Sequence, residues 1–180
     1  AKTVSRLKEL RPDMLVETLL GDFQGHLDYV DVTVDAKPDV WAHNVEVVRR
    51  LQRTIRDVRC SYEQSLRVLG RAKGRDPSRI TKSSIMVGIG ETDDEVTETM
   101  RDLRAAGVDI VTLGQYLRPS PKHAPVDRFV HPDQFAAWAE QAREMGFAYA
   151  ASGPLVRSSY KAAEAFVRGV LRPDDPDAVL

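Results

Sequence analysis

The chain is 180 residues long, enough for one domain with a hydrophobic core, and its 42% hydrophobic and 29% charged residues are typical of a globular protein. Its 26 basic and 27 acidic residues nearly cancel, and no basic stripe stands out, so a nucleic-acid partner is not expected. No apolar run approaches the roughly 20 residues of a membrane span and no signal peptide opens the sequence, so a membrane location is not expected either.

The first half of the chain alternates predicted helices and strands. Val4, Leu7 and Leu10 predict a short helix that Pro12 ends, and two apolar runs, at 14–20 and 40–42, predict strands. From residue 44 a helix is predicted by apolar residues that would share one face, namely Val45, Val48, Leu51, Ile55 and Val58. Ser61 and Gln64 have the spacing of a capping box, so a further helix is predicted to begin there.

The second half continues this alternation. The predicted elements are a strand over 84–90, a helix over 92–107, a strand over 108–113, a helix over 132–146 and a strand over 147–151. Thr92 and Glu95 form a capping box, and Pro132 suits a first helical turn. Such alternation predicts an α/β fold with a parallel sheet.

A doubly wound sheet and a (β/α) barrel share this pattern, and the polar residues decide between them. They gather where the predicted strands end, at Asp22, His43, Asn44, Glu91, Gln115, Tyr116 and Ser152. In a barrel these strand ends converge on one mouth, and no GxGxxG motif supports a dinucleotide fold. About five strands are visible, so we predict a partial (β/α) barrel over 1–168, incomplete at its N-terminal side, with a flexible tail over 169–180.

Two junctions carry candidate binding residues. Asn44 and Glu46 suit the hydroxyls of a ribose, although Asn44 could instead cap a helix, and His43 is expected to be structural. In the sequence GIGE, Gly88 and Gly90 allow close backbone approach and Glu91 stands at the mouth, although a tight turn would need the same glycines. Lys82 is a candidate Schiff-base lysine of an aldolase-like barrel, but it lies at the wrong end of its strand.

Two later segments complete the candidate site. The stretch at 114–126 begins at a strand end and becomes a proline-rich loop, in which Tyr116, Arg118 and His123 would line a pocket or decorate the surface. The sequence RSSY at 157–160 follows a turn at Gly153 and Pro154. Its serines would either cap a terminal helix or carry chemistry.

Taken together, five segments resemble the lipoyl synthase family of radical S-adenosylmethionine (SAM) enzymes. They are LGDFQG at 20–25, VWAHNVE at 40–46, TKSSIMVGIGET at 81–92, DIVTLGQYLRPS at 109–120 and ASGPLVRSSYKA at 151–162. Their order makes the resemblance specific, and it covers about residues 5–168. Gly21 departs from the family, which has proline there, but glycine also permits the turn.

A larger departure concerns cysteine. The family builds two [4Fe–4S] clusters on a CxxxCxxC motif and three further cysteines, whereas this chain has only Cys60, which matches none of them. One cysteine also excludes an internal disulfide and a cysteine-based zinc site. In the family these cysteines all lie N-terminal to the region that this chain resembles, so we expect the chain to be the C-terminal portion of a longer polypeptide. The alternative is a homologue that naturally lacks the cysteines.

The resemblance implies a role for each candidate residue. Ser159, in preference to Ser158, would be the serine ligand of the auxiliary cluster, with Arg157 nearby to offset negative charge. Asn44 and Glu46 would contact the ribose and methionine region of SAM. Adenine would lie against the stretch that contains Gly88, Gly90 and Glu91, and against the backbone of Gln115 and Tyr116.

The resemblance further implies sulfur insertion into a protein-bound octanoyl chain. The partners would be octanoylated lipoyl-carrier domains and an electron donor such as ferredoxin or flavodoxin, in the cytoplasm or, in a eukaryote, the mitochondrial matrix. Two rivals remain: a biotin-synthase-like radical-SAM enzyme, against which the RSSY end argues, and a catalytically inactive fragment or scaffold that binds a partner, which the missing cysteines favour.

Overall fold

A computed structural model describes residues 1–158 of the protein. Within them, five parallel strands form one sheet in the order β1-β2-β3-β4-β5, so each strand pairs with its successor in the chain. The strands are β1 (Glu17–Leu19), β2 (Val40–Ala42), β3 (Ile80–Val87), β4 (Ile110–Gln115) and β5 (Tyr149–Gly153).

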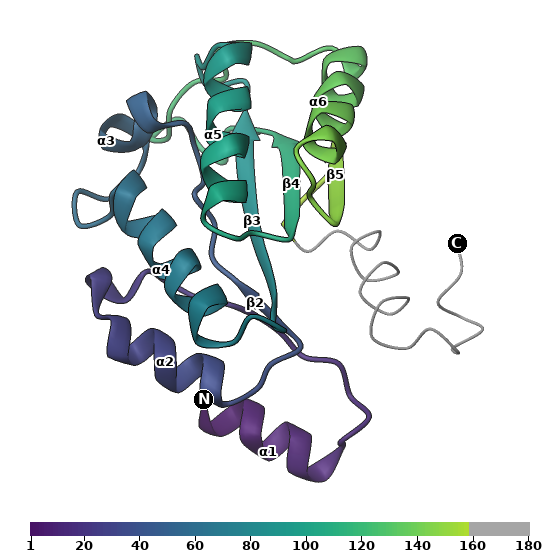
Figure 1. The fold of residues 1–180 in the computed structure, drawn as a ribbon. Coiled ribbons are helices and arrows are strands. Elements are labelled where there is room, and N and C mark those ends of the chain that lie inside the picture. Colours follow the sequence, from purple (N-terminus) through teal and green to yellow (C-terminus); the bar gives the residue numbers. More distant parts are fainter. Residues whose placement is uncertain (159–180) are drawn as a thin grey trace.

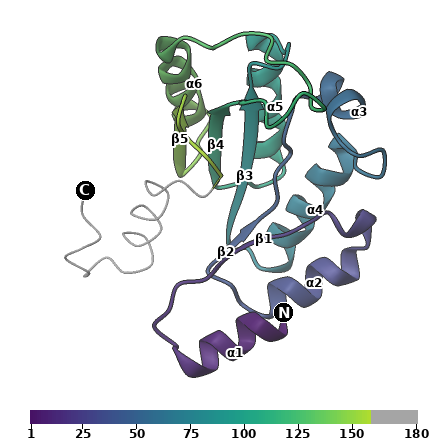
Figure 2. The ribbon, with the colours of Figure 1, turned by 180° about the vertical axis from the view of Figure 1, so that it is seen from behind.

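The helices that connect the strands cover one face of this sheet (Figure 1). They are α2 (Leu27–Asp35), α4 (Tyr62–Arg75), α5 (Asp93–Ala105) and α6 (Pro132–Glu144), while α1 (Lys2–Leu10) precedes β1 and the short α3 (Gln52–Ile55) precedes α4. Seen from behind, the opposite face of the sheet has no helix over it among the described residues (Figure 2).

Strand order and helix placement together identify the fold. A doubly wound sheet reverses its strand order at a switch point and carries helices on both faces. Here the order never reverses and the connecting helices lie on one side, which is the arrangement of a barrel wall whose inner face is still open. The predicted partial (β/α) barrel is therefore confirmed.

The main core lies between the sheet and its helices. Every second strand residue faces the helices, so Trp41, Ile85 and Leu113 are fully buried against apolar side chains of α2, α4, α5 and α6. The Trp41 indole also donates a hydrogen bond of 2.9 Å to the Thr33 hydroxyl on α2. This one-sided core fixes which strand residues remain for the inner face of the barrel.

The helix predicted from residue 44 is wrong. Residues after Asn44 continue beside β3, where the Glu46 amide donates to the Ser84 carbonyl (3.1 Å) and the Met86 amide donates to the Glu46 carbonyl (2.7 Å). Helical structure begins only at the 3-10 turn η2 (Arg49–Leu51), and Val58 is 92% exposed. The apolar residues have a helical spacing, but the backbone here pairs with the neighbouring strand β3 instead of forming a helix. Asn44 therefore caps no helix.

Other differences concern element ends. Helix α2 was not predicted, because LDYVDVTVD alternates apolar and acidic residues without a helical start signal. Strand β1 is shorter than the run at 14–20, β3 begins at Ile80 rather than 84, and β5 ends at Gly153 rather than 151. The Thr92 capping box and the Pro132 helix start are confirmed, but the Gln64 side chain turns to Asp22 instead of completing a box with Ser61.

Among residues 1–158, no helix combines the length and the apolar character that crossing a bilayer requires.

Candidate functional site

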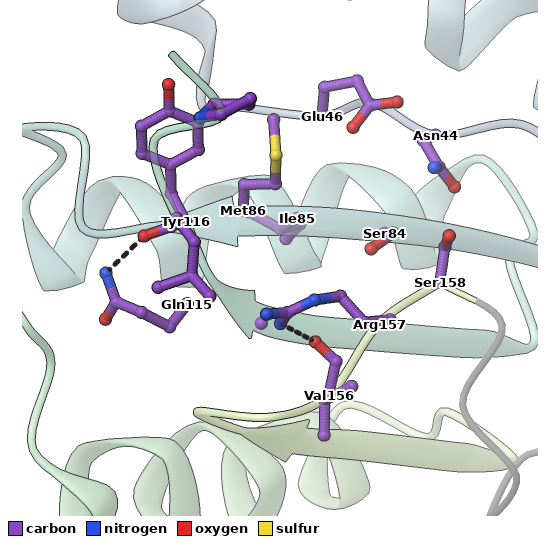
Figure 3. A pocket seen from close by; sticks show the side chains of 13 residues that line it. Asn44, Glu46, Ser84, Ile85, Met86, Gln115, Tyr116, Val156, Arg157 and Ser158 are labelled. Atoms are coloured by element: carbon purple, nitrogen blue, oxygen red, sulfur yellow. Dashed lines mark hydrogen bonds between the residues drawn. The ribbon is translucent and has the colours of Figure 1, made fainter. Parts of the chain in front are cut away.

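The carboxyl ends of the strands meet at a pocket of about 230 Å³, here called the mouth pocket (Figure 3). It is lined by Asn44, Glu46, Ser84, Ile85, Met86, Gly114, Gln115, Tyr116, Leu117, Pro119, Val156, Arg157 and Ser158. These residues come from the segments that follow β2, β4 and β5, and from β3 and β4 themselves. The sequence prediction that polar strand ends share one opening is thus supported for these segments.

Asn44 and Glu46 stand together on one wall of this pocket. Glu46 has a left-handed backbone (φ 69), which non-glycine residues adopt rarely and which is held here by its bridge to β3. Burial raises the pKa of the Glu46 carboxyl, although a hydrogen bond with Asn44 and the charge of Arg56 oppose that shift. An amide beside a partly buried carboxylate offers a donor and an acceptor to a ligand with neighbouring hydroxyls.

A second pocket of about 300 Å³ shares that wall. It is lined by Leu19, Leu20, Gly21, Asp22, His43, Asn44, Glu46, Arg56 and Cys60. His43 is satisfied within the fold, because its Nδ1 lies 2.8 Å from the Leu20 carbonyl and its Nε2 lies 3.0 Å from the Ser65 hydroxyl. Burial lowers the pKa of His43, which suits the structural role predicted for it.

The GIGE turn lies beside the mouth pocket rather than in its lining. Gly88 and Gly90 both have positive φ, and a Cβ on Gly88 would lie well under 3.0 Å from the Gln115 amide and the Arg128 carbonyl. The Glu91 carboxylate accepts hydrogen bonds from the amides of Gly88 (2.7 Å) and Ile89 (2.9 Å). The Glu91 side chain is only 5% exposed, so its role in the fold is to close this turn. Its predicted contact with adenine stays a prediction.

Gln115 and Tyr116 reach the pocket while their polar ends are engaged elsewhere. The Gln115 amide donates to the carbonyls of Tyr116 (3.1 Å) and Arg128 (3.0 Å) and accepts from the amide of Val130 (2.9 Å). The Tyr116 hydroxyl donates to the Ala124 carbonyl (2.9 Å). Both side chains therefore fix the following loop, which leaves the backbone as the part available to a ligand.

After β5 the chain turns back over the end of β4 (Figure 2), and residues 154–158 are here called the strap. The close approach requires Gly114, because a Cβ there would lie well under 3.0 Å from the Val156 carbonyl oxygen. Arg157 donates to that same carbonyl (2.7 Å), and Ser158 lines the mouth pocket. Ser159, the predicted ligand, lies outside the described residues.

Gly114 and the strap contact were missed by the sequence reasoning. A signal was present, since a glycine inside a strand often marks the close approach of another backbone. The sequence prediction for this stretch concerned only the next two residues, Gln115 and Tyr116.

Lys82 faces the inside of the barrel wall below the mouth pocket. Its ammonium lies 2.8 and 2.9 Å from the two carboxylate oxygens of Glu17 on β1, and its side chain is 2% exposed. It does not line either pocket, so the geometry gives no support to a Schiff-base role. The ion pair instead joins β1 to the middle of the sheet.

Removing the carboxylate of this pair is expected to destabilise the fold. A buried cation without its partner costs several kcal/mol, but the Glu17 side chain is 36% exposed, so Glu17→Gln should cost about 2 kcal/mol of unfolding free energy in urea titrations. Adding Lys82→Met should recover most of that loss. Glu9→Gln, which breaks an exposed pair with Arg6, is the control and should cost under about 0.5 kcal/mol; equal losses would contradict the role of burial.

Comparison with known proteins identifies the family. A lipoyl synthase from Sorangium cellulosum is 68% identical over 185 residues, which cover 95% of this chain and 50% of that protein. The mitochondrial lipoyl synthase of Eremothecium gossypii is 55% identical over 96% of the chain and 47% of that protein. The chain belongs to the lipoyl synthase family. It spans about half the length of these relatives.

A third lipoyl synthase, the chloroplastic lipoyl synthase 2 of Populus trichocarpa, is 54% identical over 99% of the chain and 45% of that protein. The recognition made from five short segments is thereby confirmed. No protein-family model matches the chain. The compartment of the present chain stays a prediction, because the names of these relatives point to different organelles, the mitochondrion and the chloroplast.

The fold also has a relative among solved structures. A radical S-adenosylmethionine methyltransferase from Kitasatospora setae, solved with cobalamin and a [4Fe-4S] cluster bound, matches with a TM-score of 0.50 and 15% identity. The match covers 70% of this chain and 26% of that one. At this identity the likeness concerns the fold alone, and it agrees with the partial α/β barrel described above.

The cofactors of the family fit this chain unequally. An iron–sulfur cluster is normally held by several cysteine thiolates, and the chain has one cysteine, whose thiol pKa is raised by burial. Within residues 1–158, no three His, Cys, Asp or Glu side chains are placed to hold a metal ion. The residues present therefore do not fit a cluster, whereas Asn44 and Glu46 at the mouth pocket suit the polar part of SAM.

Proposed function

We propose that the chain is part of a lipoyl synthase that inserts sulfur into a protein-bound octanoyl chain. The observation that carries the proposal is the similarity to lipoyl synthases along nearly the whole chain. The mouth pocket supports it, because the family's predicted SAM residues Asn44, Glu46, Gln115 and Tyr116 share its lining. SAM, when bound, is the source of the radical that removes hydrogen from the acyl carbons.

In this proposal the chain's own residues bind and orient. Asn44 and Glu46 hold the ribose and methionine region, and the backbone after β4 lies against adenine. Gly88 and Glu91 keep the neighbouring turn closed, so they would support the adenine side of the pocket without lining it. The strap brings Ser158 to the pocket, and Ser159, the proposed cluster ligand, is the next residue in the sequence.

The partners are proposed on the same footing. They are octanoylated lipoyl-carrier domains, which present the acyl chain, and an electron donor such as ferredoxin or flavodoxin. We place the reaction in the cytoplasm or, in a eukaryote, the mitochondrial matrix.

The decisive experiment joins this chain to the N-terminal region that its relatives possess. After anaerobic reconstitution, the extended protein is expected to bind two [4Fe–4S] clusters, measured by iron content and visible absorbance, and to lipoylate an octanoylated carrier domain. The 180-residue chain alone should show neither, because it lacks the cysteine ligands. Turnover by the chain alone, or an extended protein without clusters, would overturn the proposal.

The serine ligand is tested in the same extended protein. Ser159→Ala is expected to lower the iron content toward one cluster, because the auxiliary cluster would lose its only oxygen ligand. Ser158→Ala is the matched control, one residue earlier on the strap, and should leave both clusters in place. Cluster content unchanged by Ser159→Ala would remove Ser159 from this role.

A further inference from the structure

The loop that follows β4 has two different sides. Its inner side is apolar, since Tyr116, Ala124 and Val126 pack in a small separate core with Val47 and Ile89. Its outer side is exposed over most of residues 117–126, a segment here called the mouth loop. Leu117 and Pro119 belong to this segment and also line the mouth pocket, so the outer surface is continuous with the candidate site.

The mouth loop is held in one shape by its own contacts. The Tyr116 hydroxyl bonds to the Ala124 carbonyl, and the Arg118 guanidinium donates to the carbonyls of His123 (2.9 Å) and Pro121. The Ser120 hydroxyl lies 2.9 Å from the His123 ring. Three prolines in ten residues further restrict the backbone. A surface organised in advance loses little entropy when a partner binds.

The charged side chains of the mouth loop and the strap are all basic. Residues 117–126 contain Arg118, Lys122 and His123 and no carboxylate. Arg157, which is exposed on the strap, lies across the same pocket. No acidic side chain of the described residues forms an ion pair with Arg118, Lys122 or Arg157, so all three charges are available to an acidic partner.

Exposed apolar side chains lie among these basic residues on the mouth loop and the strap. Leu117 on the mouth loop is 51% exposed, and Leu155 on the strap is 79% exposed. Two exposed leucines and two arginines therefore stand on the mouth loop and the strap, and arginine and clustered exposed apolar side chains are features of protein–protein interfaces.

We propose that the mouth loop, with Arg157 and Leu155 of the strap, is the docking surface for an acidic face of the acyl-bearing carrier domain. This inference rests on the proposed function, which supplies the acyl chain. Acidic side chains of the carrier would meet Arg118, Lys122 and Arg157. The two leucines would pack around the acyl attachment as the chain enters between the mouth loop and the strap.

The test uses a charge reversal that leaves the pocket intact. Lys122 is exposed, and it neither lines the pocket nor holds the loop through its side chain, so Lys122→Glu changes charge alone. In the extended, cluster-loaded enzyme, Lys122→Glu is expected to weaken binding of an octanoylated lipoyl-carrier domain about tenfold at low salt. The loss should shrink as salt is raised, because exposed charges are screened.

The matched control is Lys2→Glu, the same charge change on α1, which lies at the other end of the molecule from this loop (Figure 1). It should leave carrier affinity unchanged. The unacylated carrier should bind more weakly than the octanoylated one, and Lys122→Glu should weaken both by the same factor. SAM affinity should be the same in all three proteins.

Three outcomes would overturn the docking surface. They are equal losses in Lys122→Glu and Lys2→Glu, no loss in either, or a loss of affinity for the electron donor but not for the carrier. The last would assign the surface to the donor. Lipoylation by the wild type decides the proposed function separately, since an active enzyme with normal carrier binding in Lys122→Glu refutes the docking surface alone.

Discussion

Replacing Gly114 with alanine is expected to push the strap away from β4 and to lower lipoylation by the extended enzyme roughly 100-fold. The new Cβ would lie well under 3.0 Å from the Val156 carbonyl, which is backbone and cannot rotate aside. The strap would therefore move with Arg157 and Ser158, two residues of the pocket lining. Displacing a site by about 1 Å commonly costs a factor of this size.

Hydrogen exchange measures the cause directly. In the Gly114→Ala protein the amides at 154–158 should exchange faster, while those of β3 and α5 should keep their protection. Gly74→Ala is the matched control, because no atom lies within 4 Å of its Cβ in helix α4, where alanine is favoured by about 1 kcal/mol. Normal exchange and activity in Gly114→Ala would show that the strap does not depend on this approach.

The fold was predictable because alternation and capping are local signals. Each strand of the sheet follows its predecessor in the chain, so the order of elements already determines the order of strands. Thr92 and Glu95, three residues apart, specified a helix start that the structure contains. The error at 44–58 has the opposite cause, since a local apolar spacing could not reveal that Glu46 pairs with β3 through its backbone.

The candidate site was predictable only in part. The residue types at strand ends placed Asn44, Glu46, Gln115 and Tyr116 near one opening, because parallel strands end at one edge. The residue types could not show which of the polar side chains already form hydrogen bonds within the fold. The Glu91 carboxylate is taken by two backbone amides and the Gln115 amide by the loop it holds, and both facts depend on tertiary contacts.

Exchanging the Glu46 carboxylate for an amide is expected to weaken SAM binding roughly 10- to 100-fold, the size of one lost charge-assisted hydrogen bond or two. In Glu46→Gln the side chain keeps its length and its hydrogen bond with Asn44. A glutamine also tolerates the left-handed backbone of Glu46 as well as glutamate does. The loss would therefore report the charge and not a rearranged wall.

The acidity of Glu46 makes this binding dependent on pH. Burial raises the pKa of its carboxyl above 4.5, so protonation begins at a higher pH than for an exposed glutamate. The ligand needs the charged form, and SAM affinity should therefore fall as pH decreases through the raised pKa. Asp22 does not contribute to this dependence of SAM affinity on pH. Burial alone would raise its pKa, but hydrogen bonds from the Gln64 side chain and the Gln24 amide help to hold that pKa below 3.8.

Calorimetric titration of SAM into the extended enzyme over a series of pH values checks both expectations. Wild-type affinity should decline as the pH is lowered through the raised pKa of Glu46, whereas Glu46→Gln should bind weakly and almost equally at every pH. Glu98→Gln, an exposed glutamate on α5, should follow the wild type. A Glu46→Gln protein that kept the wild-type slope would mean that another group titrates, and a ribose would then have no reason to lie against this wall.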